Sequence, residues 1–184
     1  MRMYHHKYLE LLREACTKFN VHLIADEIAV GFGRTGTMFG FEQAKITPDI
    51  ICLSKGITGG YMTLSTILTT DDIYDAFYDE YEKLNAFLHS HSYTANPIAC
   101  SAANATLNLF KKMKVIENNK KLSLHMKKCF ESLNDHPHVS DVRQKGMVLA
   151  IELVKNKKKK LAYDWKERRG IKAYLHGLKN NVLM

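Results

Sequence analysis

The sequence predicts an α/β protein. Two apolar runs, "VHLIAD" (21–26) and "PDIICLS" (48–54), are continuous enough to suit buried strands of a parallel sheet, and "TLSTILTT" (63–70) reads as a third such strand. Stretches with helical periodicity precede and follow them. Seven of the ten glycines fall between residues 31 and 60. Glycine-rich connections after strand ends are where open α/β sheets bind ligands, although glycines also mark ordinary turns.

The elements follow in order along the chain. Residues 4–19 carry apolar side chains at a helical spacing, and Pro48 is a stop signal before the second strand. Asp71 and Asp72 follow the third strand and favour the start of a helix, because carboxylates stabilise helix N-termini. The first half of the chain therefore predicts a helix, three strands and a further helix.

From Asn96 onward the pattern becomes mainly helical. Asn96 is a good N-cap and Pro97 suits the first helical position, so one or two long amphipathic helices are expected to follow. Residues 139–154 then indicate a strand pair broken at Gly146, and 162–179 a last helix. We place a domain boundary within the long helix near residue 110, with an α/β part over 1–110 and a smaller α+β part over 111–184.

The sequence patterns at both ends of the chain indicate a piece of a longer protein. The first helix leads directly into the middle of a sheet, and the closing "NNVLM" starts a strand pattern and stops. We therefore expect this chain to be a fragment.

Composition indicates an ordinary water-soluble protein. The chain is 46% hydrophobic and 25% charged, no apolar run is long enough to cross a bilayer, and the N-terminus lacks a secretory h-region. Cys16, Cys52, Cys100 and Cys129 form no C-x-x-C pair, which favours reduced, buried thiols over a zinc site or disulfides. We expect a cytoplasmic protein that binds no membrane.

The net charge of +8 raises the possibility of a nucleic-acid partner. The excess lies mostly on the polar side of the long helix and in "KNKKKK" (155–160), an expected exposed turn. Neither group alternates with aromatic side chains, as a single-strand binding surface would. A solvated lysine-rich face is therefore favoured over nucleic-acid binding, which remains an alternative.

The motif "GFGRTG" (31–36) matches the G-x-G-x-x-G of dinucleotide-binding turns. Such a turn opens a helix directly, so that the pyrophosphate meets the helix N-terminus. Here the first glycine comes five residues after Asp26, and the following "TMFGFEQAK" makes a poor helix. The context argues against a nucleotide loop.

Asp26 and Lys55 each close a predicted parallel strand, which makes them a candidate pair in one crevice. A lysine between apolar residues and "GITGG" is placed for a lowered pKa, as a Schiff-base lysine requires. An aspartate nearby can keep a pyridinium nitrogen protonated, as in pyridoxal phosphate sites. The competing interpretation is a strand-end lysine in a surface salt bridge.

The same residues resemble the class III pyridoxal-phosphate aminotransferases. The pattern is D-E followed by G-x-G-R-T-G and P-D-I-x-x-x-x-K-G, with Asp26 and Lys55 separated by 29 positions. Ala29 after "DEI", with "LSKGITGGYMTLS" and "YTANPIACSAAN", is most similar to the branch that aminates 8-amino-7-oxononanoate in biotin biosynthesis, usually with S-adenosylmethionine as donor. The resemblance implies part of the large domain of a fold-type-I transferase, mostly parallel sheet, with a smaller α+β C-terminal domain.

The resemblance also implies roles for individual residues. Lys55 would bind the cofactor, pyridoxal 5'-phosphate, as a Schiff base and move the substrate proton, while Asp26 would pair with the ring nitrogen and Ile28 would pack on the ring. Ser92 stands where the family has a threonine that contacts the cofactor phosphate, usually across a dimer interface. Ser90 stands at a substrate-contacting glycine, and His91 follows it; both depart from the family pattern.

The resemblance leads to further expectations. The phosphate cup, the ring-stacking aromatic and the substrate-carboxylate arginine of the family would lie outside this chain, so the chain alone is expected to be inactive. Glu27 is expected to tie down its own loop, and no metal site is expected, since His89 and His91 lack further ligands. Small-molecule substrates and a homodimer with shared sites are implied. The alternatives are a class III enzyme that uses lysine or an ω-amino acid as donor, and a non-catalytic fragment.

Overall fold

A computed structural model describes residues 2–183, which form two compact units. One unit comprises Arg2–Ser123 with Lys145–Val148, and the other comprises Leu124–Gln144 with the residues from Leu149 onward. The division into large and small domains near residue 110 stays a prediction about the fold family. Each unit is described separately below.

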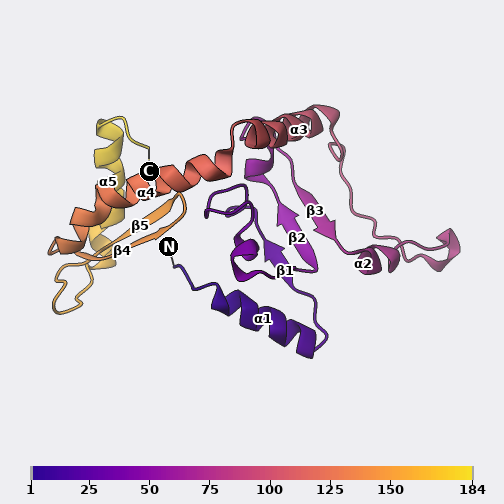
Figure 1. The fold of residues 1–184 in the computed structure, drawn as a ribbon, viewed down its shortest axis with the longest axis horizontal. Coiled ribbons are helices and arrows are strands. Elements are labelled where there is room, and N and C mark those ends of the chain that lie inside the picture. Colours follow the sequence, from indigo (N-terminus) through magenta and orange to yellow (C-terminus); the bar gives the residue numbers. More distant parts are fainter. Residues whose placement is uncertain (1, 184) are drawn as a thin grey trace. The chain divides into compact units, whose positions relative to one another are not determined.

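The first unit is built on a three-stranded sheet in the order β1-β2-β3, made of β1 (Ile24–Asp26), β2 (Ile50–Leu53) and β3 (Thr66–Thr69) (Figure 1). All three predicted strands are present. β1 and β2 are parallel, with Asp26 opposite Cys52. The third strand is antiparallel to β2, so the expectation of a third parallel strand is wrong. The chain between them contains only a short 3-10 helix and no crossover helix, and a parallel return needs a longer connection.

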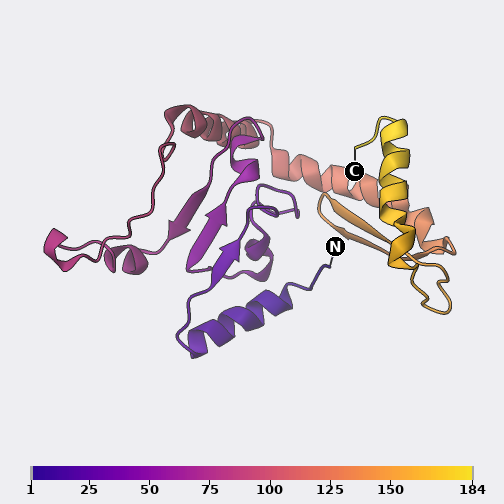
Figure 2. The ribbon, with the colours of Figure 1, turned by 180° about the vertical axis from the view of Figure 1, so that it is seen from behind.

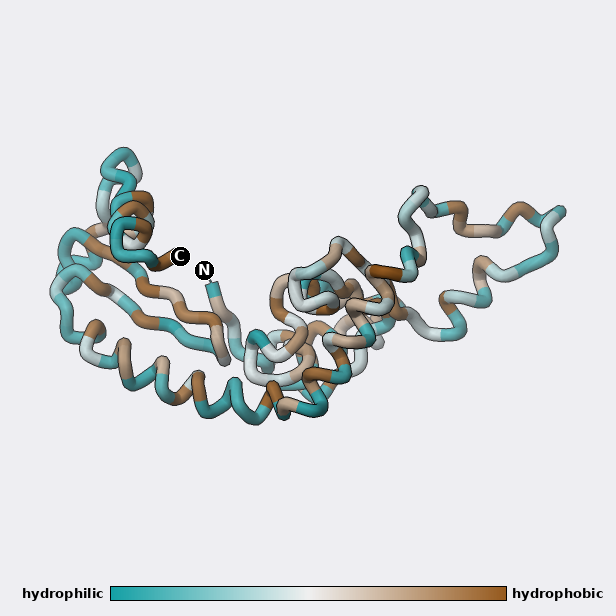
Figure 3. Tube along the Cα trace, turned by 90° about the horizontal axis from the view of Figure 1, so that it is seen from above, coloured by the Kyte–Doolittle hydropathy of each residue, from teal (hydrophilic) through white to brown (hydrophobic). Residues whose placement is uncertain are grey.

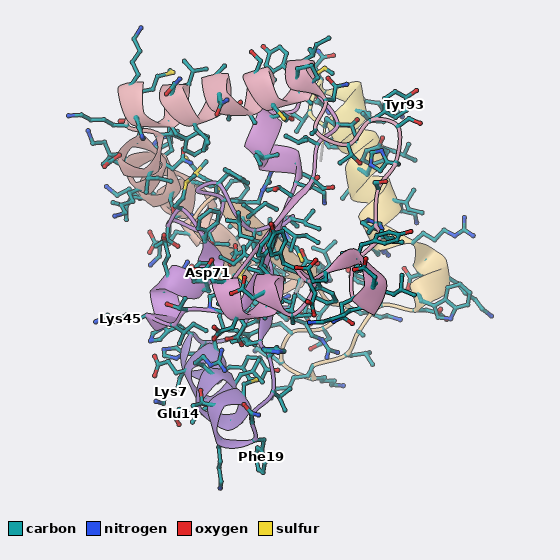
Figure 4. The ribbon with its side chains drawn as sticks, turned by 90° about the vertical axis from the view of Figure 1, so that its right-hand side faces the viewer. Lys7, Glu14, Phe19, Lys45, Asp71 and Tyr93 are labelled. Atoms are coloured by element: carbon teal, nitrogen blue, oxygen red, sulfur yellow. The ribbon has the colours of Figure 1, made fainter. Side chains whose placement is uncertain are left out.

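A carboxylate fixes the beginning of β1. Helix α1 (Lys7–Lys18), predicted over 4–19, precedes the strand. Figure 4 labels Lys7 and Glu14 in the helix and Phe19, the residue directly after it. Asp49 accepts a hydrogen bond of 2.8 Å from Arg13 Nη1 and one of 2.6 Å from the Leu23 backbone N–H. These bonds connect α1, β1 and the start of β2, and they lower the pKa of Asp49, the Leu23 N–H contributing most and Arg13 next.

The core of this unit lies where the ends of the strands meet helix α3 (Pro97–Lys112). Its buried members are Phe32, Leu53, Ile57 and Ala103, and Phe110 packs beside them. The predicted cap is confirmed, since the Asn96 side chain accepts hydrogen bonds from the backbone N–H groups of Ile98 and Ala99 at 2.9 and 3.4 Å. The helical stretch is two helices, because the chain adopts a left-handed conformation at Lys114 (φ 48°) before α4 (Val115–Phe130).

Between β3 and α3 the chain forms an extended excursion, residues 71–95, which we call the arm (Figures 1 and 2). The helix expected from Asp71 is only five residues long, α2 (Asp71–Asp75), and a 3-10 turn η3 (Tyr81–Lys83) follows. Every residue from Tyr74 to Ala95 is exposed. Hydrophobic positions recur along the arm in Figure 3, and Figure 4 labels Asp71 at its start and Tyr93 near its end.

The second unit contains most of α4 and the strand pair predicted over 139–154. Its elements are the 3-10 helix η4 (Glu131–Asp135), β4 (Val139–Lys145), β5 (Val148–Leu153), the 3-10 helix η5 (Trp165–Glu167) and α5 (Arg169–Lys179). Val139 and Val154 are its buried hydrophobic residues among those described. The lysine-rich stretch 157–160 is a turn, as expected.

Two further expectations concern the whole described chain. The four cysteines are free, but three are only half-buried and Cys129 is exposed, so the expectation of buried thiols is wrong. Cys129 lies in α4, where its Sγ is 3.5 Å from His125 Nε2. Within residues 2–183, no helix has both the length and the apolar character needed to span a bilayer.

Candidate active site

Lys55 stands on a tightly bonded turn at the end of β2. It begins the 3-10 helix η2 (Lys55–Thr58) and has a backbone φ of 46°, in the left-handed region. Two hydroxyls tie the turn to the chain that returns toward β3: Ser54 Oγ donates to the Leu64 carbonyl at 2.7 Å, and Thr58 Oγ1 to the Met62 carbonyl at 2.6 Å. The turn is therefore rigid, while the lysine itself is exposed.

The amine of Lys55 makes no hydrogen bond or ion pair with any residue in the described range 2–183. The surface salt bridge that competed with the Schiff-base interpretation is therefore not formed there. A lysine held in a strained backbone conformation, with its amine free, is available to react with a carbonyl group.

Phe32 packs against the turn that carries Lys55. It is 8% exposed and belongs to the core cluster with Leu53 and Ile57. A Cβ added at Gly56 would lie 2.8 Å from the Cβ of Phe32, so only glycine fits directly after Lys55. Phe32 is the second residue of "GFGRTG", and it connects that loop to the lysine turn.

Asp26 ends β1 beside β2, in register with Cys52. Its carboxylate is exposed, and Oδ1 accepts a hydrogen bond of 3.0 Å from the Ile28 backbone N–H. Oδ2 has no hydrogen-bond partner among residues 2–183, so it is free to accept a hydrogen bond from a protonated nitrogen. Because parallel strands end at the same sheet edge, β1 and β2 bring Asp26 and Lys55 to one side of the sheet, as predicted.

Glu27 is the buried acid of the site. It is 3% exposed, and its carboxylate accepts hydrogen bonds from the backbone N–H groups of Gly40 and Phe41 at 2.8 and 3.0 Å. These residues start the 3-10 helix η1 (Gly40–Ala44). The expectation that Glu27 ties down its own loop is confirmed, although nothing in the sequence identified its partners.

The "GFGRTG" loop has no α-helix after it; residues 28–39 are turns and bends, and η1 is a short 3-10 helix. The loop instead receives the β4–β5 turn. The Met147 N–H donates to the Arg34 carbonyl at 2.9 Å, and a Cβ added at Gly146 would lie 2.7 Å from that same oxygen. The loop is thus a packing surface for a hairpin turn, which agrees with the argument against a nucleotide loop.

Ser90, His91 and Ser92 lie in the arm, where all three are exposed. The His91 N–H donates to Thr94 Oγ1 at 3.0 Å, and the Tyr93 N–H donates to His91 Nδ1 at 3.1 Å, so this part of the arm is a local turn. Within the described range, no hydrogen bond or ring contact connects these three residues to the ends of β1 and β2. The structure places Asp26 and Lys55 at the same end of two neighbouring parallel strands, and within the described range no such contact connects the arm residues to them.

The residues fit pyridoxal phosphate better than a metal. A free lysine amine can bind the cofactor's aldehyde, and a free carboxylate oxygen can accept a hydrogen bond from its protonated ring nitrogen. Among the residues described, no group of three or more His, Cys, Asp or Glu side chains is placed to hold a metal ion. The site therefore has the characteristics of a pyridoxal-phosphate enzyme.

The chain belongs to the class-III aminotransferase family, whose model matches residues 1–183. Members of this family depend on pyridoxal phosphate. Over 166 residues the chain is 49% identical to an adenosylmethionine-8-amino-7-oxononanoate aminotransferase of Helicobacter pylori, a match that covers 88% of this chain and 38% of the relative.

Solved structures of family members agree with the fold. The adenosylmethionine-8-amino-7-oxononanoate aminotransferase of Methanocaldococcus jannaschii superposes with a TM-score of 0.90 at 42% identity, over 96% of this chain and 41% of that one. An (S)-enantioselective omega-transaminase of Thermomicrobium roseum gives 0.86 at 30% identity, over 94% and 38%. The chain thus spans about two fifths of the length of these proteins.

Proposed function

We propose that the protein transfers an amino group from S-adenosylmethionine to 8-amino-7-oxononanoate, giving 7,8-diaminononanoate for biotin biosynthesis. The observation that carries the proposal is the placement of Asp26 and Lys55 at the same end of neighbouring parallel strands. Its support is the 49% identity to the Helicobacter pylori enzyme and the superposition on the Methanocaldococcus jannaschii enzyme. A cytoplasmic location belongs to the same proposal and is supported by the four free cysteines.

Bound pyridoxal phosphate supplies an electron sink and an aldehyde that carries the amino group between donor and acceptor. In the proposal, the Lys55 amine would hold the aldehyde and would move the proton at the substrate carbon that bears nitrogen. Asp26 Oδ2 would keep a proton on the ring nitrogen, and Ile28 would pack against the ring.

We assign the arm to a second copy of the chain. Ser92 would donate its hydroxyl to the cofactor phosphate of the partner's site, with Ser90 and His91 next to the substrate. This fits the absence, within the described residues, of any bond from these three side chains to the strand ends of their own chain. A homodimer with shared active sites follows from the assignment.

Chemical trapping tests the proposal. Borohydride reduction of the full-length gene product with pyridoxal phosphate should place a pyridoxyl group on Lys55, detected by peptide mass spectrometry. Lys55→Ala should abolish this label and reduce turnover by at least about 10²-fold, the usual size of a lost proton-transfer group. Lys45, an exposed lysine at the end of η1, serves as the matched control in Lys45→Ala. Equal labelling of both lysines would contradict the assignment.

A donor screen decides between the biotin-pathway reaction and its main competitor. The likeness to the Thermomicrobium roseum omega-transaminase makes an ω-amino acid or lysine donor the alternative. With S-adenosylmethionine as donor, 7,8-diaminononanoate should form. Formation of that product only with lysine or an ω-amino acid would assign the protein to another branch of the class-III aminotransferases. No turnover with any donor would favour a non-catalytic protein.

A further inference from the structure

We propose that Glu27 is a positioning residue that holds the Asp26 carboxylate on the ring nitrogen of pyridoxal phosphate. This inference rests on the proposed function. Its starting point is the burial of an ionisable carboxylate directly beside an exposed one: Glu27 is 3% exposed, while Asp26 is exposed at the strand end. A buried carboxylate is costly unless it is bonded, so a bonded one indicates a fixed local structure.

Every polar group of Glu27 is bonded to a different part of the fold. Its N–H donates to the Cys52 carbonyl in β2 at 3.0 Å, and its carbonyl accepts from the Gly31 N–H at 2.8 Å. Its carboxylate accepts the two N–H groups at the start of η1. Residue 27 is therefore attached to the lysine-bearing strand, to the "GFGRTG" loop and to η1.

The Asp26 carboxylate, in contrast, makes a single hydrogen bond. Its Oδ1 accepts from the Ile28 N–H, and the two residues flank Glu27. The direction of the carboxylate and the place of Ile28 thus depend on the backbone at Glu27. If the Glu27 anchor is lost, both ring contacts move together, and small displacements of a carboxylate weaken a charged hydrogen bond strongly.

Gly40 confirms how closely the anchor is packed. A Cβ added at Gly40 would lie 3.3 Å from Glu27 Oε1, tighter than most real contacts. Gly40→Ala therefore displaces the carboxylate by a few tenths of an ångström while leaving Glu27 in place. It provides a second, milder variant that tests the same anchor.

Asp49 is the matched control for a purely structural role. Its carboxylate also accepts a backbone N–H, that of Leu23, at the opposite end of the β1 region from Asp26. Asp49→Asn should cost stability in the same way as Glu27→Gln, since each change removes a charged acceptor from backbone N–H groups. Only Glu27→Gln should affect the cofactor.

The experiment uses the full-length gene product and pyridoxal phosphate labelled with ¹⁵N in the ring. Glu27→Gln and Gly40→Ala should raise the dissociation constant of the cofactor, Glu27→Gln by about tenfold, the effect of one broken charged hydrogen bond. They should also lower the pH at which the ring ¹⁵N signal reports loss of the proton, because a displaced carboxylate stabilises the charged ring less. Asp49→Asn should leave the dissociation constant of the cofactor within about twofold and the pH of ring deprotonation unchanged, at an equal loss of stability.

The outcomes separate this inference from the proposed function. Equal effects of Glu27→Gln and Asp49→Asn on the ¹⁵N signal, or no effect of either, would overturn the positioning role while Lys55 labelling still supports the enzyme. If the wild-type protein holds no cofactor and Asp26→Asn changes nothing, the proposed function fails instead. If Glu27→Gln does not fold, Gly40→Ala decides alone.

Discussion

Asp49 shows how a single carboxylate connects three segments at the residue scale. It accepts hydrogen bonds from the Leu23 N–H and from Arg13, and both favour its ionised form, which lowers its pKa. A carboxyl group whose pKa is lower in the folded state stabilises the fold above its ordinary value of 3.8, and this contribution disappears as the pH falls toward the lowered pKa. Asp49 therefore contributes to acid stability.

We expect Asp49→Asn to lower the free energy of unfolding at pH 7 by about 1 kcal/mol, because one charged pair and one strong acceptor are lost. The difference between the wild type and the variant should shrink as the pH drops below 3.8, because the carboxyl then becomes protonated in the unfolded chain, and it should vanish once the pH falls through the lowered pKa of the folded state. Urea unfolding at pH 7, 4 and 2.5 measures it. A difference that stays constant with pH would contradict the role of the charge.

Gly56 provides the second prediction at this scale. Its missing side chain lets Phe32 approach the turn that carries Lys55, and a Cβ would meet Phe32 at 2.8 Å. Gly56→Ala should destabilise the protein by about 1–3 kcal/mol, as overpacking does, and should weaken cofactor trapping on Lys55.

Gly170 is the matched control for Gly56. It lies in α5, and a Cβ there would meet no atom within 4 Å. Gly170→Ala should be neutral or slightly stabilising, because alanine favours a helix. Thermal unfolding of both variants compares them, and equal destabilisation would show that the tight contact with Phe32 has no consequence.

At the scale of elements, local sequence signals set helix starts better than they set helix lengths. Asn96 and Pro97 begin α3 as predicted, because the Asn96 side chain supplies acceptors for two unpaired N–H groups. The two aspartates at 71 and 72 do begin α2, yet the helix ends at Asp75. None of its residues is buried, and a short helix without tertiary packing has little to extend it.

Asn96→Ala should remove the cap of α3 and lower the free energy of unfolding by about 1 kcal/mol. Asn96→Asp keeps an oxygen acceptor and should retain most of the stability. Chemical unfolding monitored by circular dichroism distinguishes the two. Equal losses would mean that the cap bonds to Ile98 and Ala99 contribute nothing measurable.

At the scale of the whole molecule, the arm is the feature that a single chain leaves unexplained. Eight of its nine large hydrophobic residues are between 47% and 94% exposed, Ile73 being half-buried: Tyr74, Phe77, Tyr78, Tyr81, Leu84, Phe87, Leu88 and Tyr93. Exposed apolar side chains gathered in one segment are a candidate interaction surface. This surface supports the proposed dimer, in which the arm of one copy is covered by the other.

Tyr81→Ser combined with Leu88→Ser should weaken the dimer by more than about tenfold in dissociation constant, since in the proposed dimer the other copy would cover both side chains. The two residues are 86% and 94% exposed in the single chain. Leu124→Ser, at a 64% exposed position of α4, is the control and should leave the dimer intact. Sedimentation equilibrium of the full-length gene product compares both variants with the wild type, and an unchanged mass for the double variant would remove the arm from the interface.

Much of the fold and part of the site follow from local patterns in the sequence. The strands, the cap of α3 and the strand-end places of Asp26 and Lys55 depend on apolar runs and stop signals that short windows of sequence contain. The direction of β3 does not, because it depends on how the chain turns back after Lys55. The roles of Asp26, Ile28, Lys55, Ser90, His91 and Ser92 stay predictions.

The sequence alone thus determined the class of protein, the two strand-end residues and the improbability of a nucleotide loop. Only the tertiary structure decided that Phe32 packs under Gly56, that Glu27 bonds to Gly40 and Phe41, and that the loop receives the hairpin turn at Gly146. The physical reason is the range of the interactions. Periodicity and capping act between residues a few positions apart, whereas these contacts join residues from 13 to 113 positions apart, whose proximity exists only once the chain has folded.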